Sequence, residues 1–123
     1  MLYLFLGLAG GFGVVLRFLL SRLLVSQGWT ALPFGTLFAN LIGCFLIGYL
    51  SWVLVHRWQA SEYMQLVVIA GFLGGFTTFS AFSLEAITMF QQGSSVRAIA
   101  YIVIKVSACI LMCLLGLLLA KQS

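Results

Sequence analysis

Four long apolar stretches, separated by short polar segments, follow one another along the chain. They cover residues 2–25, 34–56, 63–90 and 97–120, and charged side chains are rare within them. A helix needs about 20 apolar residues to cross a hydrocarbon core about 30 Å thick, so each stretch is long enough to cross once. The pattern predicts an all-α membrane protein, with four transmembrane helices that form a single transmembrane domain over residues 1–123.

The composition identifies lipid as the solvent. Of the 123 residues, 63% are hydrophobic and 7% are charged, whereas soluble domains contain about 25% charged residues. The mean hydropathy of +1.20 agrees with this. The net charge is +4, but the cations are scattered singly along the chain, which argues against a nucleic-acid surface.

The basic residues give little instruction about orientation, although Lys and Arg prefer the cytoplasmic side of a membrane. The side that holds both termini carries Arg57 and Lys121, and the other side carries Arg17, Arg22 and Arg97. This near balance would allow insertion both ways and pairing of two opposite copies. The alternative is a single orientation that weaker signals select.

Small residues recur one helical turn apart in three of the stretches. These residues are Gly7 and Gly11, then Gly35, Ala39 and Gly43, then Gly71 and Gly75. In lipid, small residues let helix backbones approach closely, so the pattern predicts a tightly packed bundle.

The third helix is expected to be broken near its middle. Its segment GFLGGFTTFSAFSLE covers residues 71–85. Because glycine is costly in a helix interior and threonine is restricted there, we expect unwound backbone around residues 74–78. Irregular backbone at this depth needs protein or a cavity around it, and its freed carbonyls suit a small hard cation such as sodium. A continuous helix with glycines used for packing is the alternative.

An aromatic stripe and a hydroxyl stripe follow the expected break. The phenylalanines recur every three residues and the hydroxyls one position later, at Phe76, Phe79 and Phe82 and at Thr77, Ser80 and Ser83. Ring edges are positive and hydroxyls donate hydrogen bonds, so the two stripes together suit an anion. Ordinary ring packing, with hydroxyls bonded to the i−4 carbonyls, is the competing interpretation.

Five polar side chains lie within or at the ends of the apolar stretches. Asn40 must have a partner or a ligand, because an amide that faces lipid is costly. Glu85 is expected to face a watery vestibule or to pair with an arginine, while Arg17 attracts anions to a pore mouth or snorkels. Tyr101 lies in the bundle or at the membrane interface. Lys105 is expected to snorkel toward the preceding loop and to form no site.

Three motifs together carry a resemblance to a known family. They are GGFGVVLRF, GTLFANLIGCFLIG and GFLGGFTTFSAFSLE, one in each of the first three stretches. The chain resembles the Fluc family of fluoride ion channels, also known as camphor-resistance membrane proteins, over essentially its full length. The resemblance implies an antiparallel, dual-topology homodimer with two pores that export fluoride passively. It also implies a structural sodium ion (Na+) at the dimer centre and a location in the plasma membrane of a prokaryote, which is the inner membrane of a Gram-negative cell.

The resemblance further implies roles for individual residues. The anion pore would be lined by an amide, two ring edges and two hydroxyls, from Asn40, Phe79, Phe82, Ser80 and Tyr101. The vestibule would include Glu85 and Arg17, and the backbone carbonyls of Gly74 and Thr77 would hold the sodium ion.

The chain departs from the family pattern at a few positions. Ala81, Cys109 and Cys113 stand where the family often has hydroxyl residues, and Lys105 stands where it often has an uncharged or weakly basic one. Thiols donate hydrogen bonds weakly, so we expect a thinner polar track, with either slower passage of fluoride or a greater reliance on water and on Ser80.

Three other classes of function compete with a channel. A proton-coupled exporter of the small multidrug-resistance type has the same size, but it needs a membrane-buried carboxylate in its first helix, and the first stretch here has none. A non-conducting assembly subunit accounts for the glycine stripes but not for Asn40 or the paired Phe and Ser faces. An enzyme is disfavoured because no nucleophile and base lie at a workable spacing.

Overall fold

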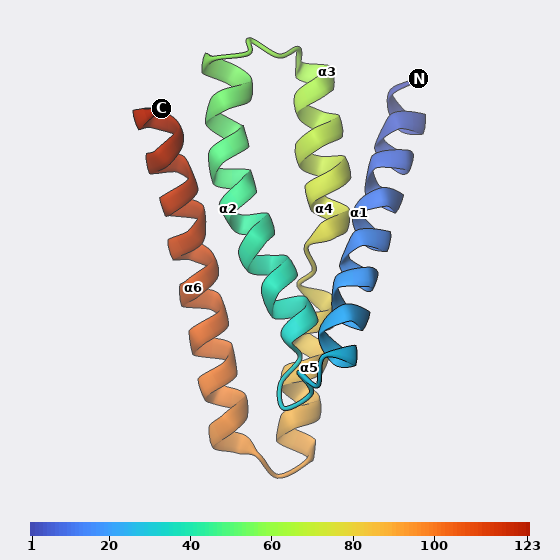
Figure 1. The fold of residues 1–123 in the computed structure, drawn as a ribbon, viewed down its shortest axis with the longest axis vertical. Coiled ribbons are helices and arrows are strands. Elements are labelled where there is room, and N and C mark those ends of the chain that lie inside the picture. Colours follow the sequence, from blue (N-terminus) through green and yellow to red (C-terminus); the bar gives the residue numbers. More distant parts are fainter.

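The computed structural model describes residues 1–123, and all of its regular structure is helical (Figure 1). The elements are α1 (Leu2–Ser26), α2 (Phe34–His56), α3 (Glu62–Gln65), the π-helical η1 (Leu66–Leu73), α4 (Gly74–Phe76), α5 (Ser80–Gln91) and α6 (Ser95–Gln122). Four segments are long and apolar enough to span a membrane, and the third of them, Glu62–Gln91, runs from α3 to α5. The predicted all-α fold with four spans is confirmed, and the ends of the spans lie within two residues of the expected ranges.

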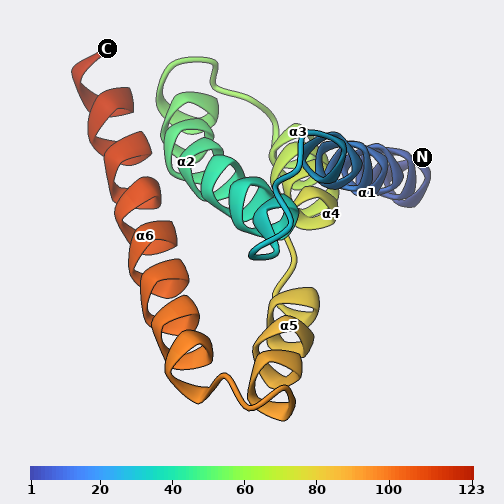
Figure 2. The same ribbon diagram turned by 60° about the horizontal axis from the view of Figure 1, so that its bottom comes forward.

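The spans run up and down, so that both termini lie at one end of the bundle (Figure 1). Both views place α2 between α6 on one side and the α3–α4 segment with α1 on the other (Figure 2). Tight turns at the opposite end contain Gly28 and Gly93, whose φ angles of 84° and 79° favour glycine. Arg57 directly follows α2 and Lys121 lies in the last turn of α6, and both of these helix ends lie at the end of the bundle that holds the termini, as the sequence predicted (Figure 1).

The third span is broken at residues 77–79, between α4 and α5. Thr77 has an extended backbone, with φ −88° and ψ 159°, and the helix resumes at Ser80. The expected break is therefore confirmed, but it begins three residues later than expected, because Gly74–Phe76 stay helical. Gly75 explains the difference, since it packs directly on the Gly10 backbone of α1, which supports this last helical turn.

Glycines bring α1 against the third span: Gly71 and Gly75 contact α1 as the sequence pattern indicated, but on α1 itself the contacts come from glycines other than the expected ones. A Cβ atom added at Gly13 would meet the Phe72 carbonyl oxygen, and one added at Gly10 would lie 3.5 Å from the Gly71 carbonyl oxygen. Gly7 and Gly11 have no neighbouring atom within 4 Å of such a Cβ. Within the subunit these two glycines therefore make no helix contact, and Gly10 and Gly13 form the contact stripe of α1 instead.

Helices α2 and α6 pack along each other through a reciprocal pair of glycines. A Cβ at Gly48 of α2 would meet the carbonyl oxygen of Cys113, and one at Gly116 of α6 would meet that of Phe45. Each glycine thus lets the facing backbone approach, which is how helices associate where lipid removes the hydrophobic driving force.

Candidate functional site

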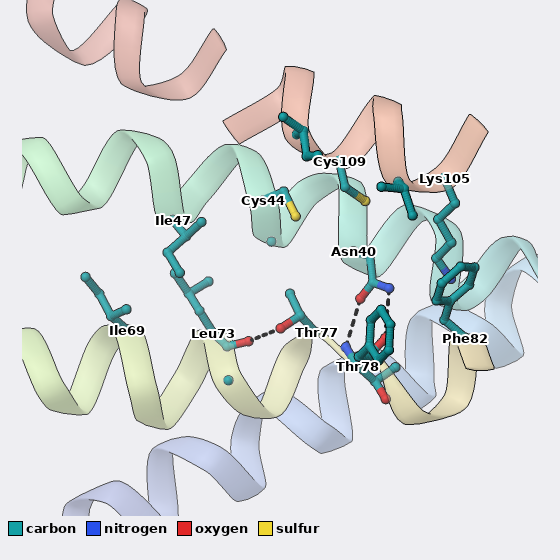
Figure 3. Close-up of a pocket in the computed structure, with 15 residues that line it drawn as sticks. Asn40, Cys44, Ile47, Ile69, Leu73, Thr77, Thr78, Phe82, Lys105 and Cys109 are labelled. Carbon is teal, nitrogen blue, oxygen red and sulfur yellow. Dashed lines mark hydrogen bonds between the residues drawn. The ribbon is translucent and has the colours of Figure 1, made fainter. Parts of the chain in front are cut away.

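A cavity of about 360 Å³ lies beside the break, between α2, the third span and α6 (Figure 3). Five of the predicted pore and sodium-site residues line it, namely Asn40, Gly74, Thr77, Phe79 and Phe82. The rest of the lining is mainly aliphatic and thiol side chains from η1, α2 and α6. The break thus brings an amide, two rings and backbone carbonyls to one hollow.

Asn40 holds the broken backbone in place (Figure 3). Its Nδ2 donates to the Thr78 carbonyl oxygen at 2.9 Å, and its Oδ1 accepts from the Thr78 backbone N–H at 2.8 Å. The backbone N–H and C=O of Thr78 no longer form helical hydrogen bonds, and the Asn40 side chain satisfies both of them. An amide nitrogen carries two hydrogens, so one N–H of Asn40 remains after these bonds.

The two threonines of the break also bond locally. Thr77 Oγ1 donates to the Leu73 carbonyl oxygen at 2.9 Å, and the Thr78 hydroxyl accepts from the Ala81 N–H at 3.2 Å. The first bond lies at the C-terminal end of α4. The second gives the Ala81 N–H, in the first turn of α5, a hydrogen-bond acceptor. Gly43 gives Thr77 room, because a Cβ there would meet the Thr77 methyl group.

The two phenylalanines after the break differ in exposure. Phe79 is 75% exposed and Phe82 only 6%, yet their rings meet edge to face, with centroids 5.5 Å apart. Phe82 also contacts the Tyr101 ring at 5.6 Å. The aromatic residues therefore connect the cavity to a polar cluster farther along α5 and α6.

That cluster surrounds Glu85. The hydroxyl of Thr36 donates to Glu85 Oε1 and Oε2 at 2.7 and 2.8 Å, and the hydroxyl of Tyr101 donates to Oε2 at 2.7 Å. Lys105 Nζ donates to Tyr101 Oη at 2.9 Å and to Thr36 Oγ1 at 3.3 Å, and it lies 3.6 Å from Glu85 Oε2. Four polar side chains from three helices thus satisfy one another inside the bundle.

This arrangement corrects the sequence-based interpretation of two charged residues. Lys105 does not snorkel toward a loop, because it is 2% exposed and its ammonium lies 4.7 Å from the centre of the Phe82 ring. Glu85 pairs with this lysine and not with an arginine. The physical reason is that a lysine buried between α5 and α6 needs an anion and hydrogen-bond acceptors, and Glu85, Thr36 and Tyr101 supply them.

A second cavity, of about 470 Å³, lies next to the cluster on the side of the α1–α2 turn. Glu85, Thr88, Gln92 and Arg97 contribute its polar lining from α5 and α6. Glu85 therefore borders this second cavity, while Lys105 borders the first.

Three of the predicted site residues, Arg17, Ser80 and Tyr101, line neither cavity, and Tyr101 belongs instead to the polar cluster around Glu85. Arg17 donates from Nε to the Gly75 carbonyl oxygen at 3.3 Å, which ties α1 to the helical turn before the break. Ser80 is exposed, and its hydroxyl lies 3.3 Å from that of Thr78. Arg17 and Ser80 both lie close to the break, Arg17 on its α1 side and Ser80 at the start of α5.

Sequence reasoning missed the part that Thr36 and Lys105 play. The spacing of Thr36 and Asn40 was a usable signal, since residues four apart share one face of a helix. A lysine in the middle of an otherwise uncharged apolar stretch was a second signal, because an intramembrane cation needs a partner.

Comparisons with known proteins identify the family of this chain. The family model described as CrcB-like protein, Camphor Resistance (CrcB), matches residues 4–117. A protein of Rhizobium meliloti (strain 1021) named fluoride-specific ion channel FluC is 42% identical over 118 residues, which cover 96% of this chain and 94% of that protein. A protein of Staphylococcus haemolyticus (strain JCSC1435) named fluoride-specific ion channel FluC 2 is 41% identical over 122 residues, which cover 99% of this chain and 98% of that protein. The chain therefore belongs to the CrcB-like, camphor-resistance family of membrane proteins.

Proposed function

We propose that this protein is a fluoride channel, which lets fluoride leave the cell passively across the plasma membrane of a prokaryote, or the inner membrane of a Gram-negative cell. The observation that carries the proposal is the cavity at the break, where Asn40, Phe79 and Phe82 meet. Bacterial relatives named fluoride-specific ion channels, similar over nearly the whole chain, support the choice of anion.

The lining suits an anion because most of its donors are neutral and its one charged residue, Lys105, is paired with Glu85. A small anion in a medium of low dielectric costs tens of kcal/mol, so a pore must replace its water with hydrogen-bond donors. The free N–H of Asn40 and the positive edges of the Phe79 and Phe82 rings supply such contacts. Since these donors are weaker than an unpaired ammonium, the ion is released readily, as conduction requires.

We also propose that two copies pair in opposite orientations. In a single copy the irregular backbone of residues 77–79 ends at an exposed surface that includes Phe79 and Ser80. Lipid at this depth offers no hydrogen-bond partner to irregular backbone. A second copy would cover this surface. The balance of two cations at one end against three at the other supports insertion in both directions.

A sodium ion at the dimer centre is part of the same proposal. The Gly74 carbonyl has lost its helical partner, because the Thr78 N–H donates to Asn40 instead. Thr77 has an extended backbone, so its carbonyl oxygen accepts no helical hydrogen bond. Such hard oxygen donors fit sodium, which when bound would contribute a fixed positive charge near the break.

The proton-coupled exporter is not favoured. The first span, α1, has no carboxylate, and the only one inside the bundle, Glu85, is occupied by two hydroxyl donors and Lys105. The only carboxylate inside the bundle therefore lies in the third span and not in the first helix, where such an exporter needs it.

The function is tested with purified protein in liposomes that are loaded with potassium fluoride. A channel moves net charge, so we expect a fluoride electrode to record efflux only after valinomycin provides a path for potassium. Efflux that instead requires a proton gradient would identify a coupled exporter. No efflux under either condition would contradict the proposal.

Replacement of either ring by an aliphatic side chain is expected to slow fluoride. Phe82→Ile and Phe79→Ile remove the positive ring edge, and since aromatic contacts contribute about 0.5–1.5 kcal/mol, we expect about ten-fold lower flux. Size-exclusion chromatography is expected to show an unchanged oligomer. Phe18→Ile, at a lipid-exposed position of α1, is the matched control and should conduct like the wild type.

A further inference from the structure

The ion pair of Lys105 and Glu85 stands between the two cavities. Lys105 lines the cavity at the break, Glu85 lines the cavity near the α1–α2 turn, and the two charged groups are 3.6 Å apart. An anion that moved directly from one cavity to the other would pass this pair.

Lys105 is the only charged residue that lines the cavity with Asn40 and Phe82. Its ammonium is 4.7 Å from the centre of the Phe82 ring, one of the two rings proposed to contact the anion. A buried ammonium at this place attracts any anion in the cavity strongly, because little water screens its charge. Glu85 opposes that attraction with an equal negative charge.

Glu85 also occupies donors that an anion would otherwise use. The hydroxyl hydrogens of Thr36 and Tyr101 both point to its carboxylate. An anion and the carboxylate therefore compete for the same two hydroxyls and the same ammonium. The strength of anion binding at this point depends on how far Glu85 satisfies these three donors.

From these contacts we infer that Lys105 and Glu85 form a charge-balanced pair that sets how tightly the pathway holds its anion. This inference rests on the proposed function. The lysine prevents the carboxylate from repelling the anion, and the carboxylate prevents the lysine from trapping it. The pair thus determines the fluoride concentration at which flux is half-saturated.

The two single neutralisations should have opposite effects on that concentration. Lys105→Met leaves an uncompensated carboxylate beside the route, so half-saturation is expected at a fluoride concentration at least about ten-fold higher. Glu85→Gln leaves an uncompensated ammonium and frees the hydroxyls, so half-saturation is expected at least about ten-fold lower, with a reduced maximal flux. The double variant, Lys105→Met with Glu85→Gln, should return toward the wild-type value.

The experiment measures initial fluoride efflux from liposomes over a range of internal fluoride concentrations. Half-saturation does not depend on the amount of folded protein, so a loss of stability alone does not change it. Lys121→Met is the matched control, because Lys121 is exposed at the end of α6, with its ammonium 5.0 Å from the centre of the Trp52 ring. Lys105→Gln, which keeps a donor for Tyr101 and Thr36, replaces Lys105→Met if that variant does not fold.

Opposite shifts in the single variants, cancelled in the double variant, support the inference. Shifts in the same direction, or unchanged half-saturation in both single variants, would overturn it while leaving the channel assignment intact. If the wild type itself passes no fluoride, the proposed function fails, and the inference fails with it.

Discussion

Asn40→Asp is expected to reduce fluoride efflux to the background of protein-free liposomes. The substitution removes the donor to the Thr78 carbonyl and places a negative charge in the cavity, at a position that is only 8% exposed. A lost bond to a buried partner together with a buried charge costs about 3 kcal/mol or more, so we expect at least about 100-fold lower flux. The fluoride-electrode assay measures this loss directly.

The control for this variant is Gln122→Glu. It makes the same change from amide to carboxylate at an exposed residue at the end of α6, and it should leave the flux unchanged. If Asn40→Asp conducts fluoride as well as Gln122→Glu does, Asn40 lies off the pathway, and the assignment of the cavity is wrong.

Gly48→Ala is expected to destabilise the subunit more than any other single methyl addition in α2. The new Cβ would meet the Cys113 carbonyl oxygen, where α2 and α6 approach backbone to backbone. Overpacking at such a contact costs about 1–3 kcal/mol, since neither backbone is able to move aside without displacing its whole helix. Thermal unfolding in detergent, followed by the loss of the monodisperse peak, measures the change.

Gly7→Ala is the matched control for the added methyl group. No atom lies within 4 Å of a Cβ at Gly7, and alanine is the better helix former by about 1 kcal/mol, so this variant should be as stable as the wild type or more stable. Equal losses in the two variants would show that glycine flexibility, and not the contact between α2 and α6, supports the fold.

The spans and the break could be predicted because each depends on local chemistry. Twenty or more apolar residues in a row suffice to predict a crossing, and the cluster of Gly74, Gly75, Thr77 and Thr78 is unfavourable for a helix. The position of the break within that cluster could not be predicted. It depends on the contact of Gly75 with Gly10 and on the bonds from Asn40 to Thr78, which join residues far apart in the sequence.

The polar cluster could not be predicted for the same reason. Thr36, Glu85 and Lys105 come from three helices, and nothing in the sequence states which helix faces another. Lys105 was interpreted as a snorkelling residue because a long side chain in a membrane helix often reaches the interface. An intramembrane cation also signals a buried partner, but the residues that supply it became evident only from the packing of α6 against α2 and α5. The same limit applies to α1, where Gly10 and Gly13 make the contacts expected of Gly7 and Gly11.

The measurement that tests the central claim most directly is the ratio of fluoride to chloride released from the same liposomes. Vesicles that contain the wild-type protein are loaded with equal amounts of potassium fluoride and potassium chloride, and two ion-selective electrodes record the release after valinomycin is added. A pathway that fits a small anion, with neutral donors and with the Lys105 ammonium balanced by Glu85, predicts rapid fluoride release, while chloride stays at the level of protein-free vesicles. Equal release of the two ions, or no release of either, would contradict the account.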